Sequence, residues 1–324
     1  MSSDNGDIRQ IAVPMYTDDK GYLGRECPEC ERYFKITPGT GITEGHPPLH
    51  CPYCNHASDI SDFWTEAQRE YALSYAGNQL WGDILKMAKK ALEFESKPRG
   101  GFGIGLSVKV EGKPAPIHHY IEEELETEVE CDTCGLRYAV YGVFAFCPDC
   151  GKHNSLQMLD KNLDLAEKKL ALAASLDTEI SEAIISDSLG NVVSALDGFG
   201  RETCQVFTPP PAKTASVSFQ NLAGARDRML KAFGIDLSGV VEADEWAYAV
   251  RCFQKRHLIA HRMGVIDEDY IAKSGDPDAI LGRRVTIDAA EVSRLIAVVR
   301  RLARGFVTAA SGGDTAATER ESET

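Results

Sequence analysis

Four Cys-x-x-Cys pairs constrain the fold of this chain most strongly, because they contain eight of its ten cysteines. A two-residue spacing lets the backbone bend so that both thiolates meet one ion, and two such pairs complete a tetrahedral zinc site. In a reducing compartment this spacing indicates metal binding rather than disulfide bonds. The predicted zinc ligands are Cys27, Cys30, Cys51, Cys54, Cys131, Cys134, Cys147 and Cys150.

Two structural Zn²⁺ ions are therefore expected. Each ion would have four protein ligands and no open position for water, so no catalytic metal is expected. The spacing leaves open whether the cysteine pairs combine within each half of this region or across the two halves. Proximity favours combination within each half, because 20 residues separate the first two pairs and 12 separate the last two.

This grouping divides the N-terminal half into small modules. The first zinc ribbon is predicted in residues 1–60, and the second in residues 99–155, where Tyr138–Phe146 is rich in strand-forming residues. Residues 61–98 have the apolar spacing of a helix, which would connect the two ribbons. Alternating apolar and polar residues predict a further short strand at Leu106–Val110.

Residues 156–308 have apolar residues at helical spacing and are predicted to form a bundle of about five helices. The prolines of Pro209–Pro211 would form a hinge within it. The final helix is predicted from a cap at Asp288 to Phe306, and residues 309–324 are expected to be disordered. The predicted fold class is α+β and multidomain, with two small β zinc ribbons, a connecting helix and an all-α bundle. The buried face of the final helix is predicted to comprise Val292, Leu295, Ile296, Val299 and Leu302.

The charge distribution limits where a polyanion would bind. The formal net charge of −14 argues against a protein that coats nucleic acid, since phosphate neutralisation needs clustered Lys and Arg. Residues 217–308, however, hold 14 basic against 12 acidic residues, so a polyanion would approach this part of the chain. The sequence starts without a basic segment followed by an apolar one, and it has no apolar stretch long enough to cross a bilayer. We expect a cytoplasmic protein without a membrane partner.

The segment from Arg251 to Gly264 reverses the overall charge. It contains four basic residues and two histidines within twelve positions and has no acidic residue. Glu242 to Arg262 contains no Pro or Gly, so the segment is expected to form the end of a helix that Gly264 terminates.

The helical spacing places three side chains of this segment on one flank. At about 100° per residue, His257 lies about 100° and His261 about 140° from Arg256, and the two histidines stack one turn apart. Histidine titrates near neutrality, so a pair can supply both the base and the acid of a proton transfer. Arginine offers planar, permanently charged donors to phosphate oxygens. These are the groups that metal-free phosphodiester cleavage needs.

Arg256, four intervening residues and His261 near the end of a long helix, with the polar His257 directly after the arginine, resemble the Arg-x4-6-His motif of the HEPN superfamily. The resemblance implies a helical bundle that dimerises, so that the motifs of two protomers meet in a shared cleft. It also implies RNA cleavage through the substrate's own 2′-hydroxyl, leaving a 2′,3′-cyclic phosphate. Many members act in toxin, phage-defence or RNA-processing systems.

Each residue of the motif receives an expected role. Arg256 would hold the scissile phosphate and the charge developing on it. His261 would be the principal proton carrier, with His257 assisting it or orienting the 2′-hydroxyl. Lys255 and Arg262 would help to hold the RNA backbone, although a role in keeping the surface soluble explains both residues equally well.

Two other functions remain open at this point. The first is a non-catalytic adaptor in which the zinc ribbons and the bundle bind partner proteins or nucleic acid, and the histidines pack or face solvent. The second is nucleotide binding by the bundle without cleavage. Acidic residues in or beside the cysteine pairs, such as Glu29 and Asp132, weaken a direct contact with phosphate, so a regulatory protein is at least as good a candidate as nucleic acid for the partner of the ribbons.

Overall fold

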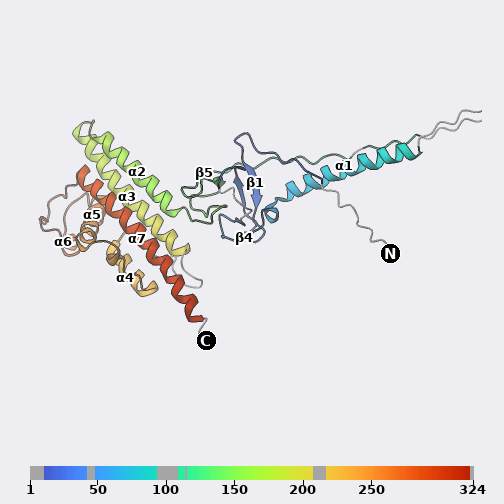
Figure 1. The fold of residues 1–324 in the computed structure, drawn as a ribbon. Coiled ribbons are helices and arrows are strands. Elements are labelled where there is room, and N and C mark those ends of the chain that lie inside the picture. The colour runs from blue at the N-terminus through green and yellow to red at the C-terminus, as the bar shows by residue number, and fades with distance from the viewer. Residues whose placement is uncertain (1–10, 42–47, 93–108, 114, 207–216, 322–324) are drawn as a thin grey trace, which may run out of the picture. The chain divides into compact units, whose positions relative to one another are not determined.

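A computed structural model describes residues 11–41, 48–92, 109–113, 115–206 and 217–321. The fold is α+β, and the chain forms two compact units, Met1–Lys152 and His153–Thr324. The first unit contains the sheets and both groups of four cysteines, and the second unit is helical (Figure 1). The hinge predicted at Pro209–Pro211 and most of the strand predicted at Leu106–Val110 lie outside the described residues.

A four-stranded antiparallel sheet forms the centre of the first unit, with strand order β1-β2-β6-β5. Its two hairpins each lie beside one cysteine group, and they join where Lys35 and Ile36 pair with Ala139 and Tyr138. The two zinc modules therefore share one sheet. The strands are β1 (Leu23–Glu26), β2 (Tyr33–Ile36), β5 (Thr127–Glu130) and β6 (Arg137–Val140).

A second, two-stranded sheet pairs β3 (Leu49–His50) with β4 (Ala57–Ser58) around the second cysteine pair. It leads into a short 3-10 helix, η1 (Ile60–Phe63), whose start is capped by the Asp59 carboxylate. Phe63 is fully buried and packs edge-on against Phe34 of β2, with ring centroids 5.9 Å apart. This contact fixes the chain on the sheet immediately before the connecting helix.

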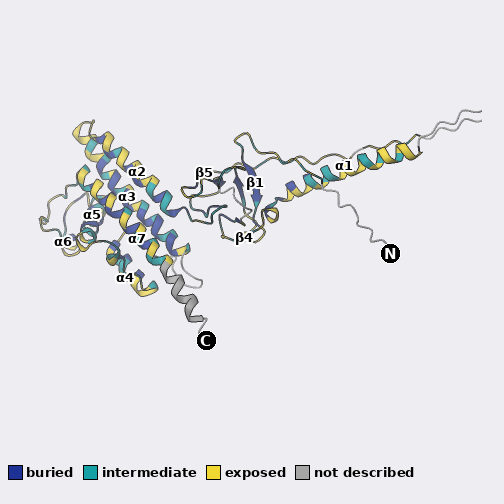
Figure 2. Ribbon diagram, viewed as in Figure 1, coloured by how far each residue is buried: buried dark blue, intermediate teal, exposed yellow. Residues whose placement is uncertain are grey.

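The connecting helix α1 (Glu66–Leu92) is continuous, and the glycines at positions 77 and 82 do not interrupt it. Its first turns pack on the sheet, where Gln68 and Tyr71 are buried. Farther along, the predicted apolar stripe is not covered, since Leu80 and Ile84 remain 46% and 54% exposed. Figure 2 shows this change from buried to exposed residues along the helix.

The second unit is a helical bundle (Figure 1), and most of its buried apolar residues form one cluster. Helices α2 and α3 form a hairpin through the short turn between Ala173 and Thr178, and α2, α3 and α7 contribute most of the core. The elements are α2 (Ser155–Ala173), α3 (Thr178–Val206), α4 (Leu222–Phe233), η2 (Leu237–Val240), α5 (Ala243–Arg262), α6 (Glu268–Ser274) and α7 (Ala289–Glu321).

Helix α7 confirms the predicted buried face, because Val292, Leu295, Ile296 and Val299 are fully buried and Leu302 is 2% exposed. A strip of this kind recurs at the 3.6-residue period and places one side of the helix against the core. The helix continues to Glu321, beyond the point where the composition predicts disorder. Ala309 and Ala310 favour this continuation past Phe306, because alanine has the highest helix propensity of any residue.

The connection after α5 also differs from the sequence prediction. The stretch from Asp267 to Asp278 is acidic and rich in turn-forming residues, which predicts a loop. The structure instead contains the short helix α6, whose start is capped by the Asp267 side chain. The β-branched residues of segment 283–287 predict a short strand, but the structure forms only an isolated antiparallel bridge there, between Arg284 and Val265. Among the described residues, no helix combines the length and apolar character needed to cross a membrane.

Candidate functional site

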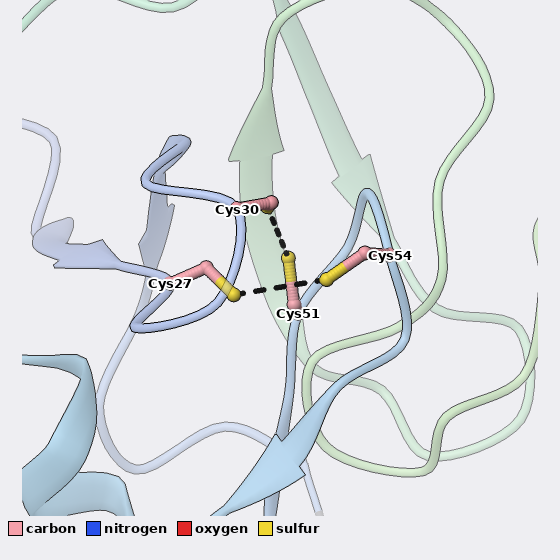
Figure 3. A group of neighbouring side chains, drawn as sticks. All are labelled: Cys27, Cys30, Cys51 and Cys54. Atoms are coloured by element: carbon pink, nitrogen blue, oxygen red, sulfur yellow. Dashed lines mark hydrogen bonds between the residues drawn. The ribbon is translucent and has the colours of Figure 1, made fainter.

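The first cysteine group brings together Cys27, Cys30, Cys51 and Cys54 (Figure 3). The Sγ atoms of Cys27 and Cys54 are 3.7 Å apart, and those of Cys30 and Cys51 are 3.6 Å apart. Four thiolates about 2.3 Å from a central Zn²⁺ would lie about 3.8 Å from one another in an ideal tetrahedron. The group therefore has the size of a zinc site with four cysteine ligands.

The second group has the same geometry. Sγ of Cys131 lies 3.7 Å from that of Cys150, and Sγ of Cys134 lies 3.5 Å from that of Cys147. Within each group the ligand atoms lie within 4.8 Å of one another. The cysteine pairs thus combine within each module, as proximity predicts, and two zinc sites are the assignment that fits these donors.

Each cysteine pair is shaped by the same backbone turn. The amide two residues after the first cysteine points at its Sγ atom, as Glu29 N does toward Cys27 at 3.4 Å. The residue after the second cysteine has a positive φ, between 57° and 75°. Glycine occupies this position in the second module, where it is free of strain, but the first module uses other residues there. The four positions are Glu31, Asn55, Gly135 and Gly151.

Burial influences the chemistry of these thiols. It raises the pKa of Cys51 and Cys147, and it raises the pKa of Cys134 to about 12. These thiols are therefore protonated at neutral pH when no ion is bound. Zinc binds thiolates, so its binding would release protons and favour the folded module.

The other candidate residues lie at the C-terminal end of α5. The helix ends with Met263 in the left-handed conformation, followed by Gly264, whose amide donates to the carbonyl of Leu258 at 3.0 Å. A small apolar cluster of Leu258, Ile266 and Tyr270 holds this end against α6. The sequence predicts Gly264 as the terminating residue, and the structure adds Met263 to the same turn.

His257 and His261 lie together on the exposed face of this last turn. Their ring centroids are 4.8 Å apart, at an interplanar angle of 53°. Both residues are exposed, so a ligand could reach either imidazole from solvent.

Arg256 precedes the histidine pair and faces a groove between α3 and α5. The residue is half-buried, and its Nη1 lies 3.5 Å from Oε1 of Gln220, a weak hydrogen bond. The groove has a volume of about 480 Å³ and also receives side chains from α2 and α3. Part of the guanidinium's hydrogen-bonding capacity is thus open to a ligand.

An acidic residue that supports Arg256 was not identified from the sequence. Asp197 and Arg201 lie four residues apart on α3, a spacing that predicts an exposed ion pair. The pair forms, but Asp197 is only 8% exposed and also accepts a hydrogen bond from the backbone amide of Phe219. Asp197 also accepts a hydrogen bond from Nε2 of Gln220 at 3.4 Å, and Oε1 of the same side-chain amide accepts the bond from Arg256. Asp197 and Gln220 lie 23 positions apart, so no local pattern could indicate this contact.

Lys255 and Arg262 differ in their availability to a ligand. The Lys255 ammonium donates to Oε1 of Glu291 at 2.7 Å and to the carbonyl of Thr286 at 2.9 Å, and the residue is 9% exposed. This location does not favour the predicted contact of Lys255 with RNA, because its charge is already paired inside the bundle. Arg262 is exposed, with its Nε 3.9 Å from the Asp267 carboxylate, and remains a candidate.

Comparison with known proteins finds no family model, no curated protein and no solved structure that matches this chain.

Proposed function

We propose that the protein is an endoribonuclease that needs no catalytic metal and cleaves RNA by attack of its 2′-hydroxyl on the adjacent phosphate. The observation that carries this proposal is the exposed pair of imidazoles, 4.8 Å apart, directly after an arginine that faces a groove. The resemblance of this segment to the HEPN motif supports the same chemistry. A toxin or phage-defence setting fits such an activity.

The three side chains divide the reaction between them. Arg256 binds the phosphate oxygens and stabilises the charge that develops during attack. One imidazole removes the proton of the 2′-hydroxyl, and the other protonates the 5′-oxygen that leaves. We assign His261 as the principal proton carrier and His257 as its assistant. The products are a 2′,3′-cyclic phosphate and a 5′-hydroxyl.

The decisive experiment incubates the purified protein with single-stranded RNA in EDTA, for a time short enough to preserve both zinc sites. Cleavage should leave a 2′,3′-cyclic phosphate, which mass spectrometry identifies, and a DNA strand of the same sequence should remain intact. His261→Ala and Arg256→Ala should lower the rate by about 100-fold or more. Lys161→Ala and His118→Ala serve as matched controls, because both residues are exposed and lie outside this segment.

The resemblance also supports a homodimer formed through the bundle, with the two motifs in one cleft. A mixture of His261→Ala and Arg256→Ala protomers would then recover part of the activity if the cleft combines residues of both chains. Light scattering measures the oligomeric state directly. A monomer with full activity would contradict the shared cleft.

A non-catalytic adaptor is the second candidate function, and a feature of the first unit favours it. A groove of about 830 Å³ there is rich in carboxylates and tyrosines, which fit a basic protein segment and repel RNA. Folded protein that binds RNA or a protein partner but leaves RNA uncut would establish this function instead. The acidic and aromatic lining residues are Glu26, Glu31, Glu66, Glu70, Glu122, Glu123, Tyr33, Tyr120 and Tyr141.

A further inference from the structure

The groove beside Arg256 has the size and lining of a small-ligand site. Its volume of about 480 Å³ lies within the range of about 300–1,000 Å³ typical of such sites. Helix α3 forms one wall, α5 forms the other, and α2 contributes a cation at the border. The lining residues with polar side chains are Lys169, Ser186, Asp187, Asn191, Ser194 and Arg256.

Gly190 keeps this groove open. It lies in the interior of α3, where glycine disfavours a helix relative to alanine. A Cβ atom added at this position would meet no atom within 4 Å, so packing within the bundle does not require glycine there. A larger side chain at position 190 would instead occupy the groove.

The lining combines the three kinds of group that bind a nucleotide. Arg256 and Lys169 come from different helices and supply positive charge for phosphates. Ile259 and Ala260 supply apolar surface for a base or a ribose. Asp187 and its neighbour one turn later, Asn191, supply hydrogen-bonding groups for the edge of a base.

The carboxylate at position 187 determines which bases suit the groove. An ionised carboxylate only accepts hydrogen bonds, so it favours a base edge that carries an amino group. Adenine, cytosine and guanine each present an exocyclic amine. Uracil lacks an exocyclic amine: where cytosine carries its amino group, uracil carries a carbonyl oxygen, which repels a carboxylate, and its one ring N–H donor lies between two such oxygens.

We propose that the groove between α3 and α5 is a nucleotide subsite, which binds a base bearing an exocyclic amino group next to the phosphate held by Arg256, and which disfavours uracil. This inference rests on the proposed ribonuclease function and specifies the substrate of that same site. Arg256 belongs both to the nucleotide subsite, whose groove it faces, and to the proposed cleavage site, because it directly precedes the histidine pair in the sequence.

The test measures binding of short fluorescent 2′-fluoro oligonucleotides, which lack the attacking hydroxyl and therefore stay intact. Oligo(A) and oligo(C) should bind the wild-type protein about tenfold more tightly than oligo(U) at constant salt. Asp187→Asn should reduce this ratio about fivefold or more, because an amide also donates hydrogen bonds. Gly190→Leu should weaken binding of oligo(A) by about tenfold, whereas Gly190→Ala adds one methyl group and should have a much smaller effect.

Gly190→Leu has the advantage that it should not impair folding, since leucine favours a helix more than glycine does. Gly82→Leu is its matched control, because this glycine also lies inside a helix with no atom within 4 Å of an added Cβ, but in the first unit. Its binding of oligo(A) should equal that of the wild type.

The results separate the subsite from the nuclease. Equal affinity of Gly190→Leu and the wild type, an unchanged base preference in Asp187→Asn, or a preference of the wild type for oligo(U) would each overturn the subsite, even if RNA is cleaved. Selective binding of oligo(A) and oligo(C) that the variants abolish, combined with intact natural RNA, would support the subsite and reject the nuclease.

Discussion

Two glycines of α3 should respond in opposite ways to the same substitution. A Cβ atom at Gly190 would meet open space, whereas one at Gly200 would lie 2.6 Å from two ring atoms of Phe219. That ring cannot easily move, because Phe219 is 1% exposed, packs on Phe306 at 5.8 Å and has its backbone amide bound by Asp197. Alanine at position 200 therefore requires a rearrangement of the core.

The size of the difference follows from the shared helix. Each Gly→Ala substitution gains about 0.5–1 kcal/mol from helix propensity and from the restricted unfolded chain. Gly200→Ala also incurs an overpacking cost of about 1–3 kcal/mol. The propensity terms cancel when the variants are compared with each other, so their free energies of unfolding should differ by about 1–3 kcal/mol, with Gly190→Ala the more stable.

Urea unfolding followed by circular dichroism at 222 nm measures this difference in the full chain. In thermal unfolding the two midpoints should differ by about 2–12 °C, because a unit of this size shifts by about 2–4 °C per kcal/mol. Equal shifts in both variants would refute the close approach of α3 to Phe219. Destabilisation by Gly190→Ala would refute the open space beside that residue, and with it the groove.

Three further outcomes are expected. Cys51→Ser should reduce the amount of bound zinc, which mass spectrometry of the native protein measures. Because the two modules share a sheet, zinc binding by the group from Cys131 to Cys150 should weaken as well, whereas the helical circular-dichroism signal of the second unit should persist. Lys255→Met should lower the free energy of unfolding by about 1–3 kcal/mol by leaving the half-buried Glu291 carboxylate without its cation, and the salt dependence of RNA binding should stay unchanged. Hydrogen bonds from Arg226 and then Ser238 hold the pKa of Asp236 below its ordinary value of 3.8. The ionised carboxylate therefore stabilises the fold above about pH 4, and this contribution is lost as the pH falls. In Asp236→Asn the free energy of unfolding should change less steeply with pH in the acid range.

The cysteine spacing allowed the zinc-ligand groups to be predicted, because two thiolates separated by two residues form a local pattern. The buried face of α7 could also be predicted, because its apolar residues recur at the period of the helix. The shared sheet has no such signal, since Ile36 pairs with Tyr138 across about 100 residues. Each hairpin alone leaves one edge of β2 or β6 without hydrogen-bond partners, and no local pattern shows which strand will pair there.

The candidate site shows the same limit. The helical spacing of His257 and His261 predicts their proximity, and the structure places their rings 4.8 Å apart. Lys255, in the same basic run, has the sequence pattern of a surface residue, but Glu291 of α7 pairs with it inside the bundle. A run of charges identifies which residues are near one another along a helix, but the partner of each charge depends on helices elsewhere in the chain.

The pairing of β2 with β6 has a consequence for synthesis of the protein on the ribosome. The β1-β2 hairpin emerges first, but one edge of β2 lacks its partner until the segment Arg137–Val140 has been translated. At about 5–20 residues per second, the intervening stretch of about 100 residues takes about 5–20 s. During that interval the nascent chain carries an open strand edge, at which a neighbouring copy on the same messenger RNA could pair incorrectly.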